Sequence, residues 1–141
     1  MIATDRADGA LDVARKNAER LSLSNVEFVR ADWYDGLPME GFDLIASNPP
    51  YVAEGDPHLR EGDLRFEPAG ALTSGADGLD ALRTIVGGAR ERLLPGAWLV
   101  VEHGYDQAAA VRALLQHAGL GELESLRDLA GIPRVAAGRR R

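Results

Sequence analysis

The chain has 141 residues, of which 45% are hydrophobic and 27% charged, a balance typical of a globular protein long enough to bury one core. It contains no cysteine, which excludes disulfides, thiolate metal sites and cysteine nucleophiles, and agrees with the reducing cytoplasm where we expect the protein to act. Sixteen basic and 22 acidic residues leave a net charge of −6, which favours a protein or small-molecule partner over nucleic acid. No apolar run has the length of a membrane span, so we expect no membrane partner.

The first part of the chain predicts a strand, a helix and a second strand. An apolar run over residues 2–4 ends at Asp5. Apolar residues then recur on one face of a helix from Ala10 to Leu21, with Asp8 as its expected N-cap. Residues 26–29 predict the next strand.

The middle of the chain combines a buried strand with a long polar segment. Residues 42–46 predict the strand, which Asn48-Pro49-Pro50 stops. Residues 52–78 are rich in Gly, Pro and Asp without a clear period, which is typical of a functional loop. A helix is predicted over residues 79–94, ended by Pro95-Gly96.

The last part of the chain predicts a strand, a helix and a closing strand pair. The strand covers residues 97–101, and the helix covers residues 107–118 with Gly119 as its C-cap. The strand pair falls at residues 122–126 and 134–137.

Alternation of strands and helices predicts an α/β fold with a mainly parallel sheet. No linker or repeat divides the chain, so we expect one domain over residues 1–141. In a doubly wound sheet the first strand and its glycine-rich turn supply the cofactor cradle, yet no such loop precedes Asp5. We therefore expect a partial domain that lacks the segment carrying this loop.

The most specific motif is Asn48-Pro49-Pro50-Tyr51, directly after a buried strand. Asn-Pro alone is a common turn, but ligands of open α/β sheets bind at the carboxyl ends of strands. An Asn oxygen and a backbone carbonyl held by prolines can accept both N–H bonds of a planar amide or amine. That arrangement would aim the nitrogen lone pair at an incoming methyl group, with Tyr51 stacked on the substrate and no base or metal required.

Three further residues follow the first two strands. An acidic residue such as Asp5 at a strand end commonly accepts hydrogen bonds from ribose hydroxyls, although it is also a routine helix cap. Asp32 and Trp33 suit an adenine ring, although Trp33 alone could equally be a core aromatic. With Asn48 at the third strand end, these residues predict a cofactor pocket.

No metal site and no hydrolase triad is predicted. The three histidines, His58, His103 and His117, lack metal-type spacing, and no nucleophile elbow is present. We expect Glu102 and His103 to be structural or rim residues.

These residues resemble the release factor glutamine methyltransferases, the HemK family. Asn-Pro-Pro-Tyr is shared with adenine-N6 and other amino-methylating enzymes, whereas the long loop narrows the resemblance to this family. The resemblance covers nearly the whole chain and is carried by Ile2 to Asp5, Ala10 to Ala18, Asp32-Trp33, Ser47 to Val52, Asp56 to Leu59, Gly62 to Pro68, Glu102 to Gly104, Arg127-Asp128, Gly131 and Arg134-Val135.

The resemblance implies a Rossmann-like class I fold that uses S-adenosylmethionine to methylate N5 of the Gly-Gly-Gln glutamine of peptide chain release factors. It also implies that Asp5 binds the ribose, that Asp32 and Trp33 flank the adenine, and that residues 48–51 hold the glutamine amide. The family's N-terminal helical domain and glycine-rich loop have no counterpart in the sequence. Two alternatives are an adenine-N6 methyltransferase of nucleic acid and a non-catalytic binding module.

Overall fold

A computed structural model of the chain describes residues 1–37, 41–60 and 68–141. The described residues form two compact units, Met1–Met39 and Glu40–Arg141. The expectation of one partial catalytic domain over residues 1–141 stays a prediction. No helix among the described residues combines the length and apolar character needed to cross a membrane.

The first unit is a two-stranded parallel sheet with one helix. Strand β1 (Ile2–Asp5) pairs with β2 (Glu27–Arg30) in the register Ile2↔Glu27 to Asp5↔Arg30. Helix α1 (Asp8–Arg20) connects the two strands and buries Leu11 and Ala18. Since parallel strands need a crossover, these elements form a βαβ unit, as the sequence predicts.

Helix α1 begins without the side-chain cap that was expected at Asp8. Its N-cap residue is Ala7, and Asp8 is the first helical residue, so that prediction was wrong by one position. The Ala7 N–H donates instead to Oδ1 of Asp5 at 2.7 Å. Asp8 lies in the first turn, where its charge complements the helix dipole, and it pairs with Arg30 at 3.3 Å.

The second unit contains a four-stranded mixed sheet in the order β3-β4-β6-β5. Its strands are β3 (Phe42–Ser47), β4 (Leu93–Glu102), β5 (Leu120–Arg127) and β6 (Pro133–Arg140). β3 and β4 are parallel, whereas β6 runs antiparallel to both β4 and β5. The predicted closing strand pair is confirmed. The sheet was expected to be mainly parallel, but among these strand pairs β1–β2 and β3–β4 are parallel, whereas β4–β6 and β5–β6 are antiparallel.

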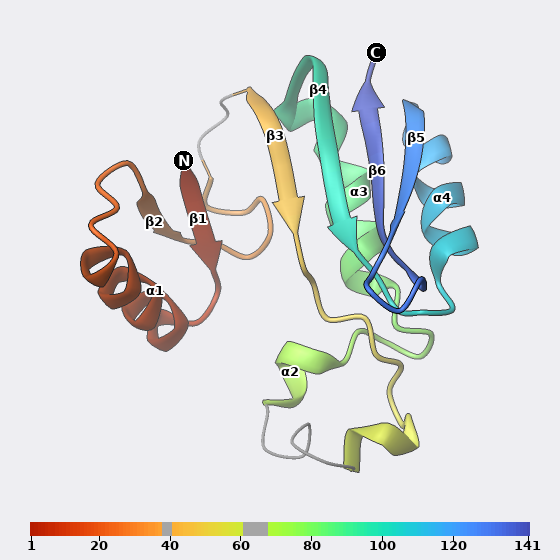
Figure 1. The fold of residues 1–141 in the computed structure, drawn as a ribbon, viewed down its shortest axis with the longest axis horizontal. Helices are drawn as coiled ribbons and strands as arrows, with labels where there is room; N and C mark the ends of the chain where they lie inside the picture. Colours follow the sequence, from red (N-terminus) through yellow and green to blue (C-terminus); the bar gives the residue numbers. More distant parts are fainter. Residues whose placement is uncertain (38–40, 61–67) are drawn as a thin grey trace. The chain divides into compact units, whose positions relative to one another are not determined.

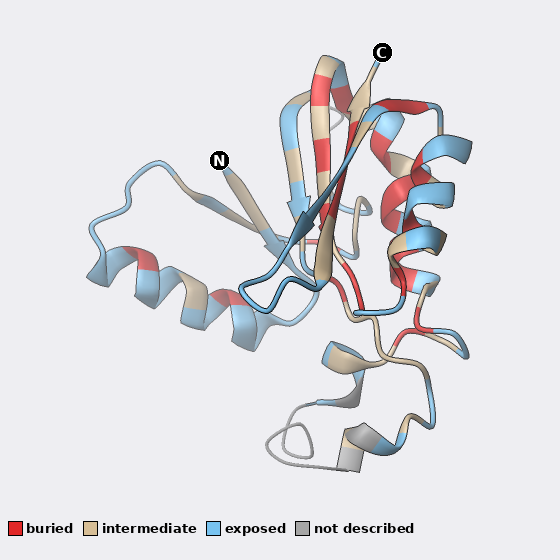
Figure 2. Ribbon diagram, turned by 45° about the vertical axis from the view of Figure 1, so that its right-hand side comes forward, coloured by how far each residue is buried: buried red, intermediate tan, exposed pale blue. Residues whose placement is uncertain are grey.

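Helices α3 (Asp80–Arg92) and α4 (Ala108–His117) cover one face of this sheet (Figure 1). The buried residues gather between these helices and the sheet (Figure 2). They include Leu82, Ile85, Val86, Leu93, Leu99, Val101, Val111 and Leu115. The predicted loop over residues 52–78 contains a 3-10 turn, Pro57–Arg60, and a short helix α2, Ala69–Leu72. Residues 61–67 of that loop lie outside the described residues.

Helix α3 ends earlier than Pro95-Gly96, where the sequence predicted its end. Leu93 already belongs to β4, pairs with Phe42 of β3 and is fully buried. Burial of this side chain between sheet and helix outweighs its helix propensity. The proline and glycine instead coincide with a register shift between β3 and β4. At the end of α4, Gly119 follows the C-cap residue Ala118 with φ +74°, the conformation for which glycine was expected there.

We predict that Leu99→Ala lowers the free energy of unfolding of the second unit by about 2–5 kcal/mol, because Leu99 is 0% exposed and its truncation leaves a cavity. Denaturant titration followed by circular dichroism measures the change. Leu129→Ala is the matched control, since that leucine is fully exposed at 109%. Equal effects of the two substitutions would contradict this description of the core.

Candidate functional site

In the first unit, Asp5 and the segment after β2 meet at the carboxyl end of the two-stranded sheet. The pairing of β1 with β2 continues past the strands, since the Ala31 N–H donates to the Asp5 carbonyl at 3.1 Å. The bond from the Ala7 N–H uses one lone-pair site of the exposed Asp5 carboxylate, which has about four. The side chain is therefore oriented and keeps acceptor capacity for hydroxyl donors.

Trp33 lies in a tight turn just beyond Ala31. The turn runs from Asp32 to Asp35, whose backbone N–H groups donate to each other's carbonyls at 3.1 and 2.9 Å. Trp33 has φ +53°, which is uncommon for a residue with a bulky side chain. Backbone strain of this kind concentrates at functional sites, and here it occurs at the half-exposed Trp33, directly after the exposed Asp32.

In the second unit, the Asn48-Pro49-Pro50-Tyr51 segment leaves the carboxyl end of β3. Asn48 is exposed, Pro49 is buried, and Pro50 and Tyr51 are half-buried. The two prolines carry no backbone N–H and hold φ near −65°, so this stretch offers acceptors and has little freedom to move. The asparagine is thus presented from a rigid support.

The Tyr51 side chain is anchored by Glu102 and Arg134. Its hydroxyl donates to Glu102 Oε1 at 2.9 Å and accepts from Arg134 Nη2 at 2.8 Å. Arg134 also approaches Glu102 at 3.5 Å and lies over the Tyr51 ring, 5.2 Å from its centroid. Arg134 thus occupies one face of the ring, and the proposed stacking of substrate on Tyr51 would have to use the other.

This network determines the acidity of the tyrosine. Burial raises the pKa of Tyr51 above its ordinary value of 10.0. The hydrogen bond and charge of Glu102 raise the pKa further, whereas the charge and hydrogen bond of Arg134 lower it in part. Since the folded state holds this proton more tightly than the unfolded chain, the network's contribution to stability is complete below about pH 10 and decreases above it.

His103 is a structural residue rather than an exposed acid–base group. It is 0% exposed, its backbone N–H donates to the Arg134 carbonyl at 2.9 Å, and its Nδ1 lies 2.8 Å from the Gly104 carbonyl. Within residues 1–37, 41–60 and 68–141, no group of three or more acidic or histidine side chains is placed to hold a metal ion.

The sequence located the strand-end residues but missed what supports them. The structure brings Asp5, Asp32 and Trp33 to one edge of the first unit, and places Asn48 to Tyr51 at the sheet edge of the second. The sequence predicted no role for Arg134 and Gln107, and Glu102 was expected only to be a structural or rim residue. A usable indication existed for Glu102, because it ends a buried strand parallel to β3 and so reaches the same edge as Asn48. The loop motif at residues 62–68 falls, except for Pro68, outside the described residues.

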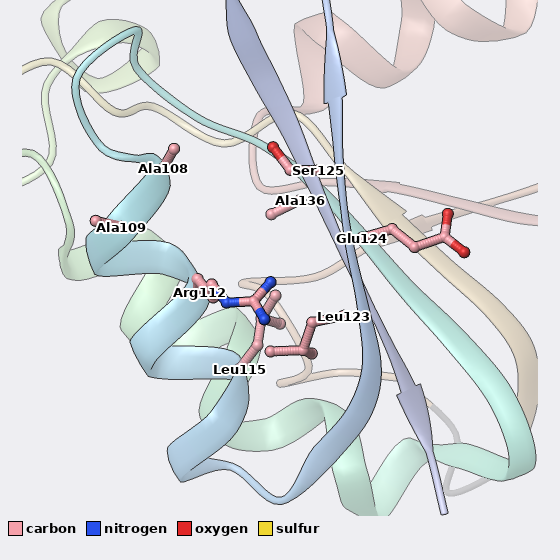
Figure 3. Close-up of a pocket in the computed structure, with 8 residues that line it drawn as sticks. All are labelled: Ala108, Ala109, Arg112, Leu115, Leu123, Glu124, Ser125 and Ala136. Carbon is pink, nitrogen blue, oxygen red and sulfur yellow. The ribbon is translucent and has the colours of Figure 1, made fainter.

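A separate hollow of about 170 Å³ lies between α4 and the strands β5 and β6 (Figure 3). None of the predicted site residues lines it. Its wall consists of Ala108, Ala109, Arg112, Leu115, Leu123, Glu124, Ser125 and Ala136. It is therefore distinct from the strand-end site.

We predict that Glu102→Gln lowers the pKa of Tyr51, because it removes a negative charge beside the hydroxyl, and that Arg134→Met raises it. An NMR titration of the Tyr51 ring carbon that carries the hydroxyl measures both shifts. Glu124→Gln, an exposed carboxylate on β5, is the control. Shifts in the same direction for both variants would disprove the network as described.

The fold is shared with solved methyltransferases. A methyltransferase from Pyrococcus furiosus superposes with a TM-score of 0.72 and 19% identity, over 99% of this chain and 61% of that one. A release-factor-specific protein-(glutamine-N5) methyltransferase from Alicyclobacillus acidocaldarius gives a TM-score of 0.53 and 23% identity, over 99% and 78% of the two chains. At these identities the likeness shows the fold alone, which is the class I methyltransferase fold that was predicted.

Sequence similarity is much higher to one family. Residues 1–69 match the model of the methyltransferase small domain. The release factor glutamine methyltransferase of Xylella fastidiosa (strain Temecula1) is 55% identical over 139 residues, covering 99% of this chain and 50% of the relative. That of Bordetella pertussis is 57% identical over 137 residues, covering 96% and 50%. The chain spans about half the length of these curated relatives, and over that span its sequence is similar to that of the release factor glutamine methyltransferases.

Proposed function

We propose that the chain takes part in transferring a methyl group from S-adenosylmethionine to the side-chain amide nitrogen of a glutamine in peptide chain release factors. The observation that carries this proposal is the rigid Asn48-Pro49-Pro50-Tyr51 segment at the carboxyl end of β3. The names of the relatives supply the substrate class, and the chemistry of the segment fits it.

Asn48 and the proline-held backbone orient the substrate nitrogen in this proposal. An amide nitrogen is a weak nucleophile because its lone pair is delocalised. When the Asn48 side-chain oxygen and a neighbouring backbone carbonyl accept both N–H bonds, the nitrogen is fixed and developing positive charge on it is stabilised. The N–C bond would form as the bond between the methyl group and the cofactor sulfur breaks, and one N–H proton would leave to solvent without a resident base.

Asp5, Asp32 and Trp33 would hold the adenosyl part of the cofactor. S-adenosylmethionine supplies an electrophilic methyl group when bound. The oriented carboxylate of Asp5 suits the ribose hydroxyls, and the half-exposed Trp33 with the exposed Asp32 that precedes it suits an adenine ring. These side chains share one sheet edge, as such a ligand requires.

A protein substrate is favoured over nucleic acid by the net charge of −6. A cytoplasmic location follows from the proposed substrate, since translation takes place there. Methylation of adenine in a nucleic acid with none on a release factor would reject the proposed substrate. Partner binding that is independent of cofactor, without turnover, would favour a binding module.

We predict that Asn48→Ala lowers kcat for a release factor by about 100-fold or more, because the nitrogen loses an acceptor made for the transition state. Binding of S-adenosylhomocysteine, followed by calorimetry, should stay within about threefold of the unchanged protein. Asn17→Ala on the exposed face of α1 is the matched control and should leave both values unchanged. Retained turnover in the Asn48 variant would show that this residue does not orient the substrate nitrogen.

We predict that Asp5→Asn weakens S-adenosylhomocysteine binding by about tenfold, because an amide replaces one carboxylate oxygen by a donor and removes the charge. Calorimetric titration measures the affinity, with Asp12→Asn on the exposed surface of α1 as control. Unchanged affinity in the Asp5 variant would exclude it from the ribose site.

A further inference from the structure

Gln107, at the start of α4, holds the backbone of Tyr51. Its Nε2 donates to the Tyr51 carbonyl at 2.9 Å and to the Asp77 carbonyl at 3.3 Å. Its Oε1 accepts from the Gly104 N–H at 2.8 Å. The residue is only 8% exposed, so these bonds are largely shielded from bulk solvent. Both N–H donors of the side-chain amide and one of the two acceptor sites on its oxygen therefore have a backbone partner.

Two glycines leave the space that this side chain occupies. Gly78 has φ +74°, and a Cβ there would overlap the Tyr51 carbonyl oxygen and lie 2.8 Å from Gln107 Nε2. A Cβ on Gly104 would lie 2.9 Å from Gln107 Oε1. The slot between them accepts a side-chain amide and leaves no room for larger neighbours.

The chemistry of the slot selects an amide. Two carbonyls and one N–H converge on it, which is the complement of one NH₂ group and one carbonyl oxygen. A carboxylate of the same shape would oppose both carbonyls, and an apolar side chain would leave buried polar groups without partners. Glutamine therefore fits this position through its hydrogen-bonding groups as well as its size.

Movement at Tyr51 reaches Asn48 through two prolines. Pro49 and Pro50 connect Asn48 to Tyr51. Each proline ring fixes φ, so this connection has fewer torsions that could absorb a displacement. On the other side, Val52 is held independently, since its N–H donates to the Leu72 carbonyl and its carbonyl accepts from the Ser74 N–H, both at 2.9 Å. Loss of the Gln107 bond should therefore displace Tyr51, and the two prolines should pass this displacement on to Asn48. The loop beyond Val52 should stay folded.

We propose that Gln107 is a positioning residue that sets the orientation of Asn48 through the Tyr51 carbonyl, and that it acts on turnover rather than on substrate affinity. This proposal rests on the proposed function, because it assigns Asn48 to the substrate amide. It adds Gln107 to the residues that determine the reaction, although this residue lies 59 positions after Asn48 in the chain, at the start of α4.

The test compares Gln107→Met, which keeps the length and removes the hydrogen bonds, with Gln116→Met on the exposed side of α4. We expect Gln107→Met to lower kcat for a release factor by about 10- to 100-fold, with KM and S-adenosylhomocysteine affinity within about threefold. Gln116→Met should change none of these values. A raised KM with unchanged kcat in Gln107→Met would overturn the proposal.

NMR gives a second measurement that does not depend on activity. The amide resonance of Val52 shares its peptide group with the Tyr51 carbonyl and reports the bond, while the side-chain amide of Asn48 reports the consequence. We expect both to shift in Gln107→Met. If the unchanged protein has no turnover, the proposed function fails, and these resonances still decide the positioning. A shift at Val52 without one at Asn48 would overturn it.

Gly78→Ala tests the same contact while keeping Gln107. The added methyl group would overlap the Tyr51 carbonyl oxygen and crowd Gln107 Nε2, so we expect the same loss of kcat and the same shifts at Val52 and Asn48. This variant carries the test if Gln107→Met does not fold. Gly131→Ala is the matched control, because Gly131 also has a positive φ, +80°, and a Cβ there has no neighbour within 4 Å. Unchanged kcat and Asn48 resonances in Gly78→Ala would count against the proposal.

Discussion

The hydrogen bonds at the Tyr51 hydroxyl are the contact on which the candidate substrate site depends. They join three parts of the second unit: the segment after β3, the end of β4 at Glu102 and the start of β6 at Arg134. An unpaired tyrosine or carboxylate at such a half-buried place would be unfavourable, so the three groups require one another. The segment that presents Asn48 is held by this mutual requirement.

The mixed sheet explains how these groups come together. Parallel strands β3 and β4 deliver Asn48 and Glu102 to one edge because their carboxyl ends coincide. The antiparallel strand β6 begins at that same edge, with Val135 opposite Glu102. The antiparallel strand thus contributes its first residues to this edge, whereas the two parallel strands contribute their last residues. A fully parallel sheet would have carried Arg134 to the opposite edge.

The features that could be predicted depend on residues that are close together in the sequence. Apolar periodicity located the main helices and strands, and the Asn-Pro-Pro-Tyr motif located the site edge. The supporting contacts escaped prediction because they join Tyr51 to Arg134 and Gln107, which are 83 and 56 residues away. The start of α1 and the end of α3 were misplaced for a related reason. An oxygen of Asp5 and the burial of Leu93, respectively, decide those boundaries, and neither is visible in local composition.

The missing N–H groups of Pro49 and Pro50 have a consequence for selectivity. Around Asn48 the main chain offers carbonyl oxygens and, at two successive positions, no donor. A glutamate side chain has nearly the shape of glutamine but brings only oxygens, so that acceptor would face acceptor at the backbone carbonyls. Under the proposed function, the segment would therefore disfavour a glutamate in place of the substrate glutamine, without any residue dedicated to that task.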